Sequence, residues 1–210
     1  MTVWREATDS LRAQKVTAAE TTKYLWDEQN VLHETDGALA LVAQYADLPG
    51  IWGSKFSLRR SGASAFYVPD HQGNARALTN AAQAVTDTLT TDAWGVVLAA
   101  TGATVNPYKA YAESGYYLDA PDREYVRLRD LRNDHGRWMS RDPIGFWGGD
   151  WNLFRYVHDC PTIAPDPDGL YWRWCCWWCV GWCCNVSACP PKRRLRPKPV
   201  QPQPPSPDYS

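Results

Sequence analysis

The chain has 210 residues, 44% of them hydrophobic, and a net charge of −1 from 22 Lys and Arg against 23 Asp and Glu. This length and composition suffice for one sizeable core, or two smaller ones. The balanced charge gives no indication of nucleic acid binding, and we expect no nucleic acid partner. The charged N-terminus lacks the apolar stretch of an ordinary secretory signal.

Residues 1–21 show no clear hydrophobic period, and we interpret them as a ragged lead-in with room for a short helix. From residue 22 to residue 105 the pattern changes to short apolar runs separated by turns. Four aspartates, Asp27, Asp47, Asp70 and Asp92, follow such runs at spacings of 20, 23 and 22 residues. A period near twenty-two residues predicts an array of similar supersecondary units.

Each unit of residues 22–105 is typical of a hairpin: a strand, a turn that begins at Asp, and a second strand. An Asp side chain at the turn entrance can accept hydrogen bonds from backbone N–H groups two residues on. A Gly three residues after the Asp can adopt the left-handed conformation, as Gly73 after Asp70 and Gly95 after Asp92 would. The pattern predicts an all-β fold, and four unrelated hairpins in an all-β domain are the alternative reading.

Residues 106–170 begin with Asn106-Pro107 and continue to a sequence, residues 125–129, that alternates apolar and basic side chains. The alternation predicts one strand with its basic side chains on one face. Two Asp-Pro steps follow, Asp142-Pro143 and Asp166-Pro167, with three glycines between them that permit tight turns. The aromatic side chains of this stretch are expected to be buried: Phe146, Trp147, Trp151, Phe154 and Tyr156.

The segment around the Asp-Pro steps resembles the core domain of the Rhs (rearrangement-hotspot) repeat family. The matching residues are Arg137-Trp138, Ser140-Arg141-Asp142-Pro143-Ile144-Gly145, Gly148-Gly149, Asn152-Leu153, Tyr156-Val157, Pro161 and Asp166-Pro167-Asp168-Gly169-Leu170. The hairpin period of residues 22–105 is similar to the tyrosine-aspartate (YD) repeats of the same family. The resemblance implies an array of YD-repeat hairpins that forms part of a shell like those of Rhs proteins and teneurins.

The same resemblance implies a self-cleavage site of the aspartyl-protease type. Its residues in this chain are Arg129, Asp142 and Asp166, and the cut falls between Leu170 and Tyr171. The chemistry is reasonable, since two carboxylates held close together cannot both ionise, and one then keeps a proton while the other activates water. The alternative is that both aspartates only begin turns ahead of proline.

Residues 171–189 hold five tryptophans and six cysteines, and residues 190–210 hold eight prolines and five cations. The composition predicts a variable segment followed by a disordered, Pro-rich basic tail. Two alternatives concern residues 171–189: a metal site, for which the candidate ligands are Cys176, Cys179, Cys184 and Cys189, and contact with a membrane interface. His33, His71, His135 and His158 share no zinc spacing, and we expect no metal and no cofactor.

The preferred interpretation is a fragment of an Rhs shell, ending in its core domain, that encloses or presents its own C-terminal segment. Its expected partners are that segment and, at an exposed sheet edge, another shell chain. One alternative is a single-turnover aspartyl autopeptidase, with no turnover enzyme predicted; the other is a membrane- or partner-binding protein that acts through the Trp/Cys segment. The family suggests a secreted or cell-surface protein exported without a classical signal, and otherwise the chain is expected in the cytoplasm.

Overall fold

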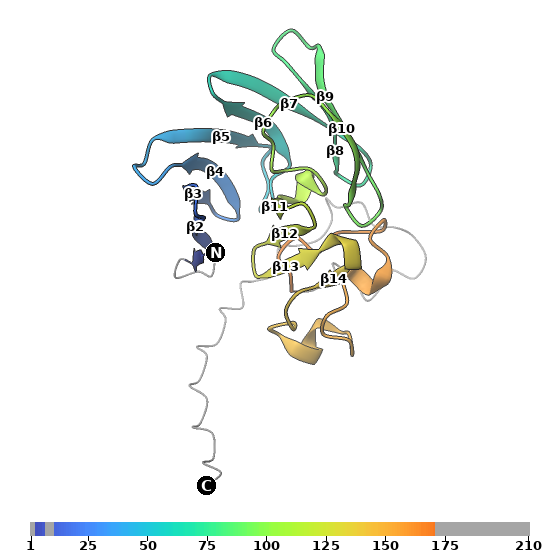
Figure 1. Ribbon diagram of the computed structural model, residues 1–210. Helices are drawn as coiled ribbons and strands as arrows, with labels where there is room; N and C mark the ends of the chain where they lie inside the picture. The colour runs from blue at the N-terminus through green and yellow to red at the C-terminus, as the bar shows by residue number, and fades with distance from the viewer. Residues whose placement is uncertain (1–2, 7–10, 171–210) are drawn as a thin grey trace. The chain divides into compact units, whose positions relative to one another are not determined.

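The computed structural model describes residues 3–6 and 11–170, which all belong to one compact unit of the chain. The predicted Trp/Cys-rich segment, the Pro-rich tail and Tyr171 lie outside the described residues. Figure 1 shows that the described chain forms a large sheet followed by a small one. Both sheets are antiparallel throughout, which confirms the predicted all-β fold class.

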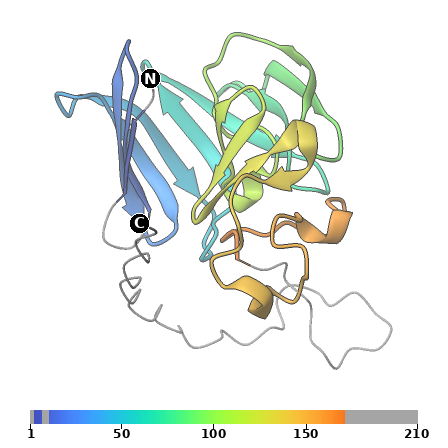
Figure 2. The same ribbon diagram turned by 60° about the horizontal axis from the view of Figure 1, so that its bottom comes forward.

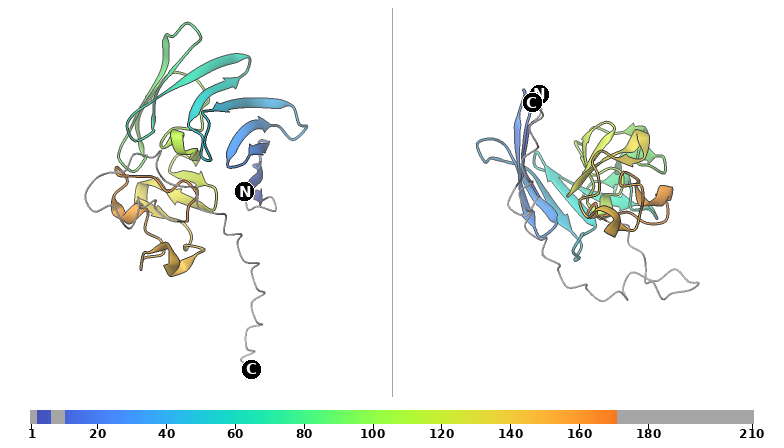
Figure 3. Two further views of the ribbon diagram at one scale, coloured as in Figure 1. Left: turned by 180° about the vertical axis from the view of Figure 1, so that it is seen from behind. Right: turned by 90° about the horizontal axis from the view of Figure 1, so that it is seen from below.

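The large sheet has ten strands, and each strand pairs with the next one in the sequence. Figure 3 shows this succession from two further sides, from the blue end of the chain to the green. The strands are β1 (Val3–Glu6), β2 (Arg12–Val16), β3 (Thr21–Asp27), β4 (Asn30–Thr35), β5 (Leu41–Asp47), β6 (Lys55–Arg60), β7 (Ala63–Pro69), β8 (Ala75–Thr79), β9 (Val85–Thr91) and β10 (Val97–Thr101). Strands β1 and β2 therefore lie in the stretch for which the sequence showed no clear period.

Four loops of the large sheet share one hydrogen-bond pattern. In each loop an Asp or Asn side chain accepts from the backbone N–H groups two and four residues on, and the residue three positions on has a positive φ. The loops begin at Asp36, Asp70, Asn80 and Asp92. The predicted Asp–Gly turns at Asp70–Gly73 and Asp92–Gly95 are confirmed.

The turns after Asp27 and Asp47 do not follow this pattern. Asp27 pairs with Asn30 across a tight turn at Glu28, where φ is 50°. Asp47 pairs with Lys55 after a longer loop, and its carboxylate forms a salt bridge of 2.8 Å with the Lys55 ammonium group. Asn30 stands three residues after Asp27, and Gly50, three residues after Asp47, is not among the residues with a positive φ. The hairpin period of the sequence therefore covers two different kinds of turn.

The small sheet consists of β11 (Tyr117–Ala120), β12 (Arg123–Val126), β13 (Arg129–Arg132) and β14 (Arg137–Trp138). The prediction of a single strand over residues 125–129 is wrong, because the chain turns back between Val126 and Arg129, which pair with each other. Arg127 adopts a φ of 51° at this turn. Its guanidinium group donates to the carbonyls of Ser114 and Pro167, and these buried contacts hold the turn where no Gly or Asn marks it.

Tyrosines of the large sheet pack against tyrosines of the small one. Tyr24 of β3 meets the Tyr117 ring edge-on at 5.5 Å, and Tyr45 of β5 meets Tyr108 in the same way at 5.0 Å. These rings belong to one core of buried side chains drawn from β3 to β8 and from residues 108–125. Figure 2 shows the small sheet, in yellow, lying against the large one. Each fully buried side chain of this size contributes about 1.5–3 kcal/mol of hydrophobic stabilisation.

A second core lies around the small sheet and the segment that follows it. Tyr111, Tyr116 and Tyr156 form a ring cluster, and Trp138 meets Tyr156 edge-on at 5.2 Å. Short 3₁₀ turns connect this region: Ala112–Ser114, Asn133–His135, Gly145–Gly148 and Val157–Asp159. The second core fixes the position of residues 129–170.

The expectation that the aromatic side chains of residues 142–167 are buried is wrong for most of them. Tyr156 is fully buried, whereas Trp147 is 93% exposed and Trp151 is 89% exposed. Phe146 is also exposed, and it packs against Trp151 with the ring centres 5.6 Å apart. The short 3₁₀ turn at Gly145–Gly148 carries its side chains outward, so that only its backbone faces the interior of the site.

Candidate functional site

Arg129 lies at the start of β13, and its side chain is almost fully buried. The guanidinium carbon lies 4.1 Å from the centre of the Trp138 ring on the neighbouring strand β14, a stacking contact that holds the group flat. The Arg129 Nε donates to the carbonyl of Gly169. The hairpin of β13 and β14 thus fixes both the direction and the plane of this cation.

The Nη2 nitrogen of Arg129 contacts two carboxylates at once. It lies 3.3 Å from Oδ2 of Asp142 and 3.2 Å from Oδ2 of Asp166. The structure therefore brings together all three residues that the sequence suggested for self-cleavage, although 24 residues separate the two aspartates in the chain. A guanidinium group suits this role because it presents several N–H donors in one plane.

Asp142 begins the turn that follows β14. Its Oδ1 accepts from the backbone N–H of Ile144 at 2.9 Å, so the residue begins a turn before proline as well as facing Arg129. Burial raises the pKa of the Asp142 carboxyl, and the Ile144 N–H and the Arg129 charge only partly offset this. The charge of Asp168 raises it further.

Asp166 is buried more deeply, with 2% of its surface exposed. Its Oδ1 accepts from the N–H groups of Gly169 and Leu170, and its backbone is held on both sides by the Tyr116 hydroxyl. Burial raises its pKa well above the usual range for Asp, and a hydrogen bond with the neighbouring carboxyl of Asp168 adds to the rise. The charge of Arg129 opposes both.

Leu170 ends the described chain inside this cluster. Its N–H lies 3.2 Å from Oδ1 of Asp166 and 3.3 Å from Oδ1 of Asp168. Its carbonyl oxygen lies close to Gly148, because a Cβ added to Gly148 would be 3.4 Å from it. The bond from Leu170 to Tyr171, the expected cleavage site, therefore begins directly beside the paired carboxylates.

A small cavity of about 20 Å³ opens next to the two carboxylates. Its walls include Arg129, Trp138, Asp142, Gly148, Asp166 and Leu170. A polar space of this size holds about one water molecule. The arrangement can therefore supply three components of aspartyl hydrolysis: two carboxyls with raised pKa values, a cation beside both, and room for water.

Three residues of this cluster were missing from the sequence interpretation of the site, although all three belong to the quoted Rhs motifs. Trp138 supports the plane of Arg129, Asp168 raises the pKa of Asp166, and Gly148 faces both Asp142 and Leu170. Trp138 follows the exposed Arg137 in the motif, but the cation that it stacks on is Arg129, nine residues earlier, so the motif gives no local signal for this contact. Nothing in the sequence separates Gly148 from the neighbouring glycines.

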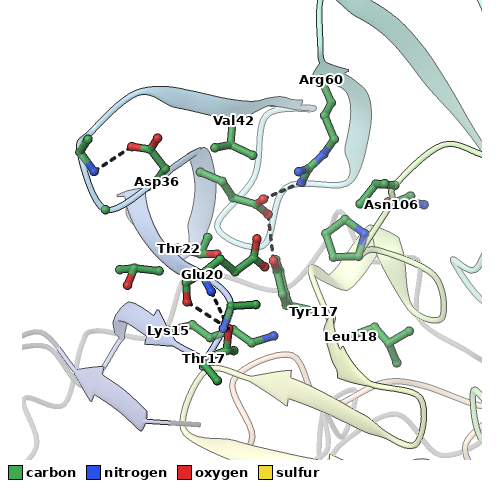
Figure 4. Close-up of a pocket in the computed structure, with 18 of the residues that line it drawn as sticks. Lys15, Thr17, Glu20, Thr22, Asp36, Val42, Arg60, Asn106, Tyr117 and Leu118 are labelled. Atoms are coloured by element: carbon green, nitrogen blue, oxygen red, sulfur yellow. Dashed lines mark hydrogen bonds and ion pairs between the residues drawn. The ribbon is translucent and has the colours of Figure 1, made fainter.

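A larger hollow of about 660 Å³ lies between β2 to β5 and the segment 105–118 (Figure 4). Arg60 and Tyr117 reach into it from different elements, and both contact Glu34: Arg60 Nη2 at 2.6 Å and the Tyr117 hydroxyl at 3.0 Å. The Tyr45 hydroxyl donates to the same carboxylate at 2.7 Å. Glu34 is therefore satisfied by side chains that join the two sheets, and the cluster acts as a structural contact.

Within residues 3–6 and 11–170, no group of three His, Cys, Asp or Glu side chains is placed to hold a metal ion. His33, His71, His135 and His158 therefore take part in no such group. Cys176, Cys179, Cys184 and Cys189 lie outside the described residues. No helix in the described part of the chain is long and apolar enough to cross a membrane.

The array of sequential hairpins, the core packed against it and the Asp-Pro segment agree with the fold expected of an Rhs-repeat shell. No family model matches the chain. The chain is 45% identical over 62 residues to the toxin subunit YenC1 of Yersinia entomophaga, covering 30% of this chain and 6% of YenC1. It is 41% identical over 58 residues to the toxin protein Tse5 of Pseudomonas aeruginosa, covering 28% of this chain and 4% of Tse5.

Solved structures share the fold. The crystal structure of TcdB2-TccC3 is 18% identical with a TM-score of 0.63, covering 80% of this chain and 9% of that one. A structure of the Photorhabdus luminescens Tc holotoxin pore is 18% identical with a TM-score of 0.64, covering 82% and 9%. The chain thus spans less than a tenth of the relatives that it matches. These partial matches to Rhs-type toxin proteins support the resemblance to the Rhs-repeat family that the motifs indicate.

Proposed function

We propose that this chain is the core-domain end of an Rhs shell that presents its own C-terminal segment and releases it by cutting the Leu170–Tyr171 bond. The observation that carries the proposal is the single Arg129 nitrogen within 3.3 Å of Asp142 and 3.2 Å of Asp166, next to the N–H of Leu170. The toxin relatives support a role with a toxin segment. One solved relative is TcdB2-TccC3 without its hypervariable C-terminal region, so a variable segment belongs to that protein.

The proposed reaction is hydrolysis of one peptide bond. The ionised carboxylate of the Asp142–Asp166 pair takes a proton from water, and the hydroxide forms a bond to the carbonyl carbon of Leu170. The protonated carboxyl of the pair gives its proton to the carbonyl oxygen. When the tetrahedral intermediate collapses, the carbon–nitrogen bond breaks, the Tyr171 nitrogen takes the proton that the first carboxylate gained from water, and one hydroxyl of the intermediate returns its proton to the second carboxylate. The products are a carboxylic acid at Leu170 and an amine at Tyr171, and the carboxyl pair again holds one proton.

The raised pKa values of Asp142 and Asp166 support this assignment of roles. Both carboxyls are more easily protonated than an exposed Asp, and burial is the main cause. The pair therefore holds one proton to higher pH than an ordinary carboxyl, while Arg129 stabilises the negative charge that remains. An aspartate that only begins a turn needs neither a second carboxylate nor a buried cation.

The test is the intact mass of the purified chain with a small N-terminal tag. Wild type is expected to yield a fragment that ends at Leu170, and Asp142→Asn and Asp166→Asn each slow the cut by about 100- to 10,000-fold, the usual contribution of acid–base groups. Asp36→Asn is the matched control, because Asp36 begins a turn of the large sheet by the same side-chain bonds but lies outside the site.

Two results would contradict the proposal. One is a wild-type chain that folds and stays at full length; the other is cleavage at Leu170 that persists in both Asn variants. A new N-terminus at Tyr171 in the released segment identifies the bond. A partner chain at the sheet edge, where β1 is the outermost described strand, stays a prediction, as does the compartment of the protein.

A further inference from the structure

Gly148 lies beside both the Asp142 carboxylate and the carbonyl group of Leu170. A Cβ added to Gly148 would be 2.9 Å from Oδ2 of Asp142 and 3.4 Å from the Leu170 carbonyl oxygen. Both oxygens therefore lie within 3.5 Å of the same position. The backbone does not explain the glycine, because Gly148 is absent from the residues with positive φ, unlike Gly145 and Gly149 in the same turn.

The position beside Gly148 has the dimensions of a water site. The cavity of about 20 Å³ includes Gly148, Asp142, Asp166 and Leu170 among its walls. A buried water needs two to four polar partners at about 2.8 Å, and two oxygens already face this space. Arg129 adds N–H donors at the same wall.

We infer that Gly148 forms the open wall of a site for the hydrolytic water, between the Asp142 carboxyl and the Leu170 carbonyl. The inference rests on the proposed self-cleavage and adds to it the place from which water attacks and the residue that keeps this place free. A side chain at residue 148 occupies the water site itself. The motif glycine at this position is then required by the reaction and not by the fold.

The first test compares two alanine variants of one turn. Gly148→Ala has no left-handed strain but fills the cavity, and cleavage is expected to slow by about 100-fold or more. Gly149→Ala is the matched control: its φ of 85° makes alanine strained, an added Cβ meets nothing within 4 Å, and Gly149 does not line the cavity. Gly149→Ala is therefore expected to lower the midpoint of urea unfolding and to keep cleaving. Gly148→Ala is expected to change the midpoint less and to lose cleavage.

The second test does not depend on activity. In a crystal structure of the full chain with Asp166→Asn, which is expected to stay uncut, one ordered water lies beside Gly148 within hydrogen-bond distance of Asp142. Adding Gly148→Ala to this variant removes that water. A site that is dry in the single variant, or a water that survives in the double variant, overturns the inference.

The outcomes separate the inference from the proposed function. If wild type and Gly148→Ala cleave at similar rates, the water site is overturned and self-cleavage is left standing. If the wild-type chain never cleaves, self-cleavage is overturned. The presence or absence of an ordered water beside Gly148 in its crystal structure then tests the water site by itself. Cleavage of wild type in water enriched in oxygen-18 is expected to place one heavy oxygen in the new carboxylate of Leu170, and its absence also overturns the inference.

Discussion

Arg129 makes the close approach of Asp142 and Asp166 possible. Two ionised carboxylates around one buried cation leave a net negative charge in a region of low dielectric constant, and Asp168 adds a third acidic group nearby. The cluster lowers this energy by keeping a proton. A substitution at Arg129 would therefore disturb folding as well as chemistry, which is why the Asn variants of the carboxylates are the better probes.

Glu124 is a second buried acid, but it lies outside the site. It is completely buried on β12, and burial raises its pKa well above the usual value despite the neighbouring Asn133 side chain; the charge of Asp119 adds to the rise. An acid whose pKa is raised by folding stabilises the folded state at low pH, and this contribution is lost as pH rises through the raised pKa.

Glu124→Gln is therefore expected to remove part of the pH dependence of stability. Wild type is expected to lose free energy of unfolding as the pH rises above the ordinary pKa of Glu, about 4.3, and the variant loses less, because glutamine has the same shape and no proton to release. Urea unfolding at an acidic and at a neutral pH measures the difference. Glu20→Gln, at an exposed position, is the control with little effect. An equal loss in wild type and Glu124→Gln would show that another group causes it.

The side chains of the site were predictable to different degrees. Arg129, Asp142 and Asp166 follow from a motif with fixed spacing, and the structure places them within one cluster. The roles of Trp138 and Gly148 were not predictable, because stacking and free volume depend on which strands meet. The exposure of Trp147, on the 3₁₀ turn Gly145–Gly148, and of Trp151, beyond that turn, was also missed, since composition alone suggests that such aromatic side chains are buried.

Among the loops, the four that begin at Asp36, Asp70, Asn80 and Asp92 are nearly interchangeable in their hydrogen bonds. The sequence indicated only those at Asp70 and Asp92, where Gly occupies the left-handed position. Leu39 and Gln83 hold the same position in the other two loops, at φ values of 70° and 63°. Side-chain bonds from Asp or Asn can thus hold a left-handed residue that is not glycine, and a search for Asp–Gly pairs misses such loops.

Two glycines of these hairpins differ in what surrounds them. Gly62 and Gly95 both have positive φ, but a Cβ at Gly62 meets nothing within 4 Å, whereas one at Gly95 would be 2.8 Å from the Ala110 Cβ. The Gly95 carbonyl also accepts from the Asn133 side chain at 3.2 Å. The loop that begins at Asp92 is therefore packed against the region of the small sheet, whereas the turn at Gly62 has open space around it.

Gly62→Ala is expected to cost about 1–2 kcal/mol of stability, the strain of one left-handed alanine. Gly95→Ala is expected to cost about 1–3 kcal/mol more, because it adds overpacking to the same strain. Urea unfolding of both variants against wild type measures this. Equal destabilisation would show that the loop can move away from the small sheet without loss.

For the described chain as a whole, the order of strands was more predictable than their number. Neighbouring hairpins in sequence pair in space, as expected of a quasi-linear array, and tyrosines such as Tyr45 and Tyr67 face one core. Strands β1 and β2 were missed because their pairing, not their periodicity, makes them strands. Arg12 of β2 forms a salt bridge of 2.6 Å with Asp119 of the small sheet, a long-range contact that no local pattern shows.

The placement of Leu170 four residues after Asp166 predicts that any cut is made within one molecule. The rate constant is expected to stay the same over about a 100-fold dilution, since the scissile bond is already at the carboxylates. Mixing wild type with a longer-tagged Asp142→Asn chain, followed by mass measurement, tests this. Cleavage of the tagged chain in the mixture, or a rate that rises with concentration, would contradict it.

The turn from Asp166 to Leu170 bears on the amount of C-terminal segment that one chain can release. The carboxylate that we propose as catalytic and the bond it would cut are parts of the same short loop, and the N–H of Leu170 is held by Asp166 and Asp168. If the proposed cut occurs, the new carboxyl end is expected to stay at the site and block it, because Leu170 remains part of this loop. The yield of free C-terminal segment then equals the number of chains made, so its dose is set by synthesis of the protein and cannot be amplified by catalysis.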